Sequence, residues 1–89
     1  MSTVFIHHQV ADFETWKSAF DDHGSTRNEY GLTDSGLYRG ADDANDVTIV
    51  LAADDAGRAQ EFLDSDSLRE AMSNAGVTSA PDVWITEEA

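Results

Sequence analysis

The stretch that decides the fold is Thr3–Tyr30, TVFIHHQVADFETWKSAFDDHGSTRNEY. Its first part, Thr3–Val10, alternates two sets of side chains, which predicts a strand with Val4, Ile6, His8 and Val10 on one face. Asp12 is a favourable N-cap for a following helix. Gly24 interrupts that helix and Gly31 ends it. One helical face carries Phe13, Trp16, Phe20, His23, Arg27 and Tyr30.

The rest of the chain predicts three more strands and a second helical region. Ser35–Gly40 and Val47–Ala53 are expected strands, joined by an acidic hairpin loop. Asp54 or Asp55 caps a helix with Ala59, Phe62 and Leu63 inward, and Asp82–Glu87 is the last strand. A further helical turn begins at a capping box, Ser67 to Glu70, with Ser65 and Asp66 as alternative starts, and ends at Gly76.

The predicted order is therefore β-α-β-β-α-β, the ferredoxin-like arrangement of the α+β class. Both helices are expected on one face of an antiparallel sheet. The strand Val47–Ala53 has apolar side chains on both faces, which predicts that a second subunit covers the other face. We expect a single domain spanning residues 1–89.

The composition is strongly acidic, with a formal net charge of −13 and no cysteine. This charge repels nucleic acid and anionic membranes, so neither is an expected partner. No apolar run reaches the length of a membrane span, and we expect a cytoplasmic protein. The surplus of aspartate over lysine favours adaptation to concentrated salt, which screens the repulsion between carboxylates.

The candidate site lies along the first helix, where His23 and Arg27 continue the apolar face of Trp16 and Phe20. His8 is predicted to lie opposite Trp16 to Phe20 if it faces the helices. His8 and His23 are the candidate catalytic acid–base residues, because imidazole titrates near neutral pH. The alternative is that each histidine is structural and that Arg27 reaches surface carboxylates. Candidate substrate-binding residues are Trp16, Phe20, Arg27 and Met72.

Three other kinds of site are disfavoured by the sequence. His7 and His8 point to opposite faces of a strand, so they do not chelate one metal ion, and we expect none. The loop from Asp42 to Asp46 lacks the glycine and glutamate of a calcium-binding EF-hand. Ser65 and Ser67 have no histidine near them in sequence, which argues against a serine nucleophile.

Several segments together resemble the dimeric α+β-barrel superfamily, and within it the small proteins related to antibiotic-biosynthesis monooxygenases, some of them described as cyclases. These segments are Val10–Lys17, Phe20–His23, Tyr38–Asp43, Leu68–Met72, Ala75–Val77 and Pro81–Val83. The resemblance covers nearly the whole chain, and it is more specific for the superfamily than for an activity.

The resemblance implies a homodimer whose sheets pack face to face, with a pocket between each sheet and its own helices. Its members include cofactor-independent monooxygenases, lactone isomerases, haem-degrading enzymes and proteins without known activity. The haem-degrading branch uses a Trp and a His of the second helix, and here that helix has neither, so a haem role is disfavoured. We expect no cofactor. The expected function is a monooxygenase-like or cyclase-like enzyme acting on an aromatic or polyketide-type substrate. The alternatives are a non-catalytic dimeric protein, ligand-binding or stress-related, and a structural interaction module.

Overall fold

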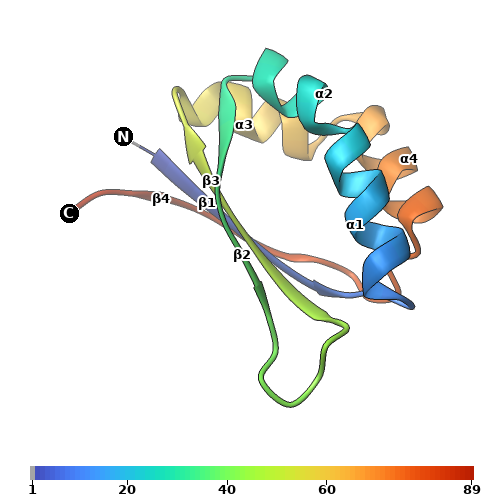
Figure 1. The fold of residues 1–89 in the computed structure, drawn as a ribbon. Coiled ribbons are helices and arrows are strands. Elements are labelled where there is room, and N and C mark those ends of the chain that lie inside the picture. The colour runs from blue at the N-terminus through green and yellow to red at the C-terminus, as the bar shows by residue number, and fades with distance from the viewer. Residues whose placement is uncertain (1) are drawn as a thin grey trace.

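The computed structural model describes residues 2–89 as a four-stranded sheet with four helices on one of its faces (Figure 1). The order is β-α-α-β-β-α-α-β, so each predicted helical region consists of two helices. In chain order the elements are β1 (Ser2–Gln9), α1 (Phe13–Asp22), α2 (Gly24–Glu29), β2 (Leu32–Arg39), β3 (Asp46–Ala53), α3 (Ala56–Leu63), α4 (Asp66–Ala75) and β4 (Asp82–Glu87).

The sheet has the strand order β2-β3-β1-β4, and every neighbouring pair is antiparallel. Each β-to-β connection through helices passes over one intervening strand, which is the split βαβ topology. The helices therefore lie on one face of the sheet, and the other face carries none of them (Figure 1). The predicted ferredoxin-like α+β fold is confirmed.

The alternation of β1 separates two environments. Val4, Ile6 and His8 face the helices and are buried, and Phe5 on the opposite face is 36% exposed. In β3 the side chains of Val47, Ile49, Leu51 and Ala53 are likewise buried toward the helices. These strands and the apolar faces of the helices enclose the core.

The ends of the helices follow local capping chemistry. The Asp12 carboxylate accepts a hydrogen bond from the Thr15 amide, and Asp55 caps α3 through the Arg58 amide. Gly31 and Gly76 adopt φ angles of 75° and 82°, left-handed values that glycine tolerates best. For α4 the capping box starting at Ser67 is not used: Ser65 accepts from the Leu68 amide, because the helix starts two residues earlier.

Strand β2 starts at Leu32, three residues before the predicted start at Ser35. A β-bulge explains the difference, since the register with β3 shifts between Asp34 and Gly36. The extra residue breaks the strict alternation that a sequence pattern relies on. It also lets Leu32, Asp34, Leu37 and Arg39 pair opposite β3 residues of the helix-facing side.

The sheet face without helices, called here the outer face, exposes large aromatic side chains. Trp84 is 53% and Tyr38 is 62% exposed. Phe5 pairs in register with both Val50 and Trp84, so these three form an apolar row across three strands. The Tyr38 ring lies against Gly36, where a Cβ atom would come within 2.8 Å of it.

Candidate active site

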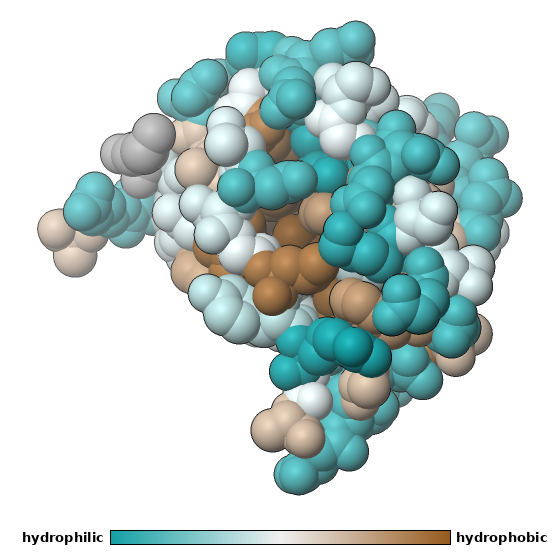
Figure 2. All heavy atoms as spheres, in the orientation of Figure 1, coloured by the Kyte–Doolittle hydropathy of each residue, from teal (hydrophilic) through white to brown (hydrophobic). Residues whose placement is uncertain are grey.

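A cavity of about 80 Å³ lies between the sheet and the helices. Figure 2 shows hydrophobic residues deep in a hollow on this side of the molecule, framed by hydrophilic ones. Its wall is mostly aliphatic and aromatic, with three ionisable side chains. The lining consists of Ile6, His8, Trp16, Ala19, Phe20, His23, Arg27, Ile49, Leu51, Phe62, Leu63, Leu68, Ala71, Met72, Ala75, Pro81 and Val83.

Helix α1 contributes a continuous row of aromatic rings. The spacing of three and four residues places Phe13, Trp16 and Phe20 on one helical face. The ring centres of Phe13 and Trp16 are 5.8 Å apart, and Trp16 stacks on Phe20 at 4.9 Å. Trp16 is only 3% exposed, so it forms the fixed wall of the cavity. Such a wall favours flat, apolar ligands.

His8 enters this wall from strand β1. It is 2% exposed, and its ring meets Trp16 edge-on at 5.7 Å between centres. Its Nδ1 atom is buried without a hydrogen-bond partner among residues 2–89. Burial lowers the pKa of His8 below its usual 6.5, because the charged ring loses its hydration. A neutral imidazole is therefore available as a proton acceptor near neutral pH.

His23 lies at the junction of α1 and α2 and also lines the cavity. Its ring centre is 5.8 Å from that of Phe62, and its Nε2 lies 3.3 Å from the Ser67 hydroxyl of α4. Burial lowers the pKa of His23, and the positive charge of Arg27 lowers it further. No histidine lies near Ser67 in the sequence, but the fold brings His23 next to it, although 44 residues separate the two.

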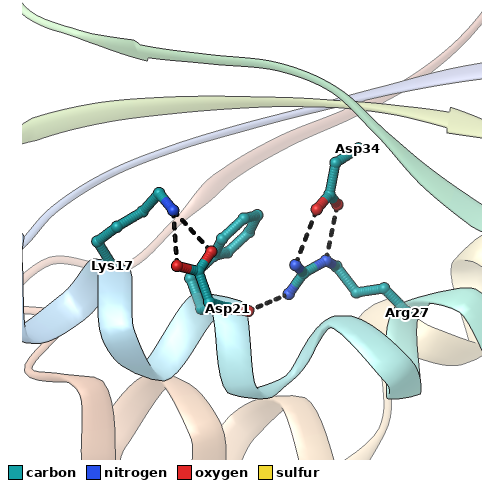
Figure 3. Close-up of polar contacts among 5 residues, drawn as sticks. Lys17, Asp21, Arg27 and Asp34 are labelled. Carbon is teal, nitrogen blue, oxygen red and sulfur yellow. Dashed lines mark hydrogen bonds and ion pairs between the residues drawn. The ribbon is translucent and has the colours of Figure 1, made fainter.

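Arg27 is almost completely buried, and its guanidinium is held by a carboxylate (Figure 3). Nε and Nη2 donate to the two oxygens of Asp34 at 2.9 and 3.0 Å, and Nη1 donates to the Phe20 carbonyl at 2.8 Å. The guanidinium also stacks on the Phe20 ring at 3.6 Å. The fork that would bind a substrate carboxylate is thus occupied by Asp34.

All six residues selected from the sequence line the same cavity: His8, Trp16, Phe20, His23, Arg27 and Met72. The sequence analysis did not select Phe62 or Asp34. Phe62 was assigned only to the core, although its ring contacts both His23 and Tyr30. No sequence pattern pointed to Asp34 as a partner of Arg27, because its position depends on the bulge in β2.

His7 lies on the outer face and has different partners. Its Nε2 is 2.7 Å from Asp46 and its Nδ1 is 3.4 Å from Asp82. Hydrogen bonds to Asp82 and Asp46 raise its pKa, although partial burial acts against them. Within residues 2–89 no group of three or more metal-ligating side chains is assembled. The same range contains no helix long and apolar enough to cross a membrane.

Solved structures with the same fold cover nearly the whole chain. A candidate antibiotic biosynthesis monooxygenase from Bordetella bronchiseptica superimposes with a TM-score of 0.79 at 12% identity, covering 99% of this chain and 96% of its own. The chain has the fold of the antibiotic biosynthesis monooxygenases. The resemblance inferred from the sequence is confirmed at this level.

Two further structures support the same assignment of fold. The cofactor-independent oxygenase SnoaB from Streptomyces nogalater has a TM-score of 0.73 at 15% identity, covering 99% of this chain and 94% of its own. A candidate monooxygenase from Nitrosomonas europaea has a TM-score of 0.71 at 15% identity, with coverages of 99% and 98%. No protein-family model and no curated protein matches the sequence.

Proposed function

We propose that the chain is a small-molecule enzyme of the cofactor-independent oxygenase or cyclase type, with its active site in the cavity beside α1. The observation that carries this proposal is the buried Nδ1 of His8, which lies in a wall of aromatic rings and has no hydrogen-bond partner within residues 2–89. An unpaired polar atom inside a protein costs free energy, so it is retained where a ligand supplies the missing partner. The name of SnoaB supports the oxygenase form of the proposal.

In this reaction His8 accepts a proton from an aromatic or polyketide-type substrate that lies against Trp16 and Phe20. The lowered pKa of His8 favours the neutral ring, which is the form that can accept a proton. The deprotonated substrate is electron-rich, and dioxygen enters as the second substrate in the oxygenase form. His23 is the second proton carrier, and Met72 contributes to the apolar wall.

For Arg27 we propose a different role from the substrate binding expected from the sequence. Because Asp34 occupies both edge donors, Arg27 positions the Phe20 ring and the junction of α1 and α2. Burial lowers the pKa of His23, and the positive charge of Arg27 adds to this effect, so both favour the neutral imidazole. We therefore propose Arg27 as a positioning residue whose aliphatic stem and ring-stacked guanidinium complete the cavity wall.

The test is oxygen uptake with a panel of anthrone-type and naphthol-type phenols. We expect His8→Leu to lower kcat/KM by about 10²–10⁴-fold, because the proton acceptor is removed and the side-chain volume is kept. His7→Asn, one residue away on the outer face, is the matched control and should change kcat/KM by less than about twofold. Equal activity of the wild type and His8→Leu would contradict the role of His8.

A second candidate function is a non-catalytic binder, and the occupied guanidinium of Arg27 favours it because the cavity then has fewer free polar groups. Measuring both binding and oxygen uptake with the same panel of phenols distinguishes an enzyme from a non-catalytic binder. Saturable binding of a phenol without oxygen uptake or product, in the wild type, would support the binder.

We also propose that two copies pack through their outer faces. The exposed row of Phe5, Val50 and Trp84 supports this, because monomeric proteins seldom expose contiguous aromatic surface. Light scattering should give the mass of a dimer for the wild type and of a monomer for Trp84→Asp. Glu61→Asp on α3 is a control that should stay dimeric.

A further inference from the structure

A groove lies between helix α1 and the edge strand β2, next to the cavity. It has a volume of about 340 Å³ and is lined by Lys17, Phe20, Asp21, Asp34, Ser35, Gly36 and Leu37. Figure 3 shows the side chains of Lys17, Asp21, Arg27 and Asp34 in the space between α1 and β2. Among residues 2–89, Phe20 alone belongs to the linings of both the cavity and this α1–β2 groove. The side chain of Phe20 therefore lies at the boundary between them.

The cavity by itself is too small for an aromatic ligand. An apolar protein cavity of about 150 Å³ admits one benzene molecule, whereas the cavity beside α1 measures about 80 Å³. Sites that hold drug-sized ligands have volumes of about 300–1,000 Å³, a range that the groove reaches. The groove alone does not bring a ligand to His8, which lines the cavity only. A fused-ring ligand that contacts His8 therefore needs both spaces, and the boundary at Phe20 has to open.

The ring of Phe20 is held in place mainly by stacking. Its centre lies 4.9 Å from that of Trp16, and the guanidinium of Arg27 stacks on it at 3.6 Å. The side chain is only half-buried. On a helix an aromatic side chain has two common χ1 rotamers, so the ring can move while the backbone of α1 stays in place. Such a rotation costs the two stacking contacts and breaks no hydrogen bond of the ring.

The two stacking partners keep their positions when the ring of Phe20 moves. Asp34 accepts hydrogen bonds from Nε and Nη2 of Arg27, and the backbone carbonyl of Phe20 accepts one from Nη1. Trp16 is 3% exposed and also contacts His8. An aromatic ring of a ligand in the place of the Phe20 ring would therefore find the same two partners.

We propose that Phe20 is a displaceable ring: a flat, neutral ligand of two or more fused rings takes its place and lies across the cavity and the α1–β2 groove. The inner ring of the ligand lies beside His8, and the outer ring stacks on Trp16 and Arg27 with its far edge toward Leu37. The inference rests on the proposed function only in bringing a hydroxyl of the ligand to His8.

The ligand is neutral because the cations next to its outer ring already have partners. Asp34 pairs with the guanidinium of Arg27 at 2.9 Å, and Asp21 pairs with the ammonium of Lys17 at 2.7 Å. Neither cation is free for an anionic ligand, and a net charge of −13 repels anions from the chain as a whole. Neutral hydroxyl or carbonyl groups suit the outer part of the groove, where Ser35 adds a further polar side chain.

The experiment compares Phe20→Ala with the wild type by titration with 2-naphthol, a neutral two-ring phenol, followed by ¹H–¹⁵N NMR. We expect Phe20→Ala to bind 2-naphthol about tenfold more tightly, because the ligand no longer displaces a stacked ring. A fixed wall predicts the opposite sign, since the ligand would lose a contact.

Phe13→Ala is the matched control. Phe13 is also a half-buried phenylalanine of α1, with its ring 5.8 Å from that of Trp16 and 3.9 Å from the guanidinium of Arg39. It belongs to the lining of neither the cavity nor the groove. Phe13→Ala should therefore keep the wild-type affinity for 2-naphthol within about twofold.

Nuclear Overhauser contacts in the wild type give a second measurement, which does not depend on the folding of any variant. Bound 2-naphthol should show contacts to the Trp16 ring and to the Leu37 methyl groups at the same time. The contacts between the rings of Trp16 and Phe20 should weaken as the ligand is added. Ligand contacts to Leu37 without contacts to Trp16, or unchanged contacts between Trp16 and Phe20, would overturn the proposal.

The titration and the oxygen-uptake assay fail independently of each other. Weaker or unchanged binding by Phe20→Ala would overturn the displaceable ring, and it leaves the proposed function intact if His8→Leu still abolishes oxygen uptake. Tighter binding by Phe20→Ala in a chain that takes up no oxygen would support the displaceable ring and contradict the enzyme. No binding of 2-naphthol by either protein would contradict both.

Discussion

His7 and His8 are neighbours in β1, and the sheet places them in opposite environments. His8 faces the helices and is 2% exposed, and in the described part of the chain its Nδ1 has no hydrogen-bond partner. His7 faces outward between Asp46 and Asp82. Burial lowers the pKa of His8, and hydrogen bonds to carboxylates raise that of His7. The comparison shows that chemistry here depends on which face a residue occupies, since the residue type is the same.

The largest expected effects come from replacing two tryptophans: Trp16 of α1, which packs in the core on the helix-facing side of the sheet, and Trp84 of β4, which lies on the outer face. Trp16→Ala should lower the free energy of unfolding by about 3–5 kcal/mol at every protein concentration, because it opens a cavity in the core. Trp84→Ala should cost stability only where the outer face is paired, so its effect should disappear on dilution. Denaturant unfolding at several protein concentrations measures both, and equal, concentration-independent losses would contradict the assignment of faces.

The pH dependence of stability should have opposite signs for the two histidines. His8 has a lowered pKa, so its contribution is present above 6.5 and is lost as the pH falls through the folded-state pKa. His7 has a raised pKa, so its contribution is present below 6.5 and is lost as the pH rises through the folded-state pKa. Each group contributes a slope of at most about 1.4 kcal/mol per pH unit.

Urea unfolding at pH values from 5 to about 8 checks these signs. His8→Leu should flatten the acidic side of the profile, and His7→Asn should flatten the side above 6.5. His8→Leu should also keep or raise stability at pH 7, because it removes an unpaired buried polar atom. A large loss of stability in His8→Leu would mean that the imidazole has a structural partner after all.

Salt should affect His7 and His8 differently, because dissolved ions screen exposed charges much more strongly than buried ones. Raising KCl from about 0.1 M to about 2 M should move the pKa of His7 back toward 6.5 and leave that of His8 low. The melting temperature should rise over the same range, because the net charge of −13 is screened. NMR titration and thermal unfolding measure the two effects, and full stability without salt would refute adaptation to brine.

The smallest expected effect concerns the contact between His23 and Ser67. Ser67→Ala should change the free energy of unfolding by less than about 0.5 kcal/mol, because the 3.3 Å contact is solvent-exposed. Ser73→Ala on the same helix is the matched control for helix propensity. If Ser67→Ala shifts the ring signals of His23 and Ser73→Ala does not, the hydroxyl orients this imidazole.

Much of the fold and of the candidate cavity could be predicted because its signals are local. The alternation in Thr3–Val10 correctly grouped His8 with Val4 and Ile6 on one face, which the structure shows to be the helix-facing side, and helical spacing grouped Trp16, Phe20 and His23. The start of β2 was predicted wrongly, because its bulge depends on pairing with β3. The start of α4 was left open between Ser65, Asp66 and Ser67, since each of them is a plausible cap.

The order of strands and helices, the acidic composition and the set of β1 side chains that share a face could be read from the sequence alone. These follow from periodicity and composition, which are properties of short segments. Which face of β1 meets the helices, the Asp34 carboxylate in the fork of Arg27 and the contact between Ser67 and His23 emerge only in the folded chain. Such pairings depend on strand register and helix packing, because they join residues that no local pattern connects.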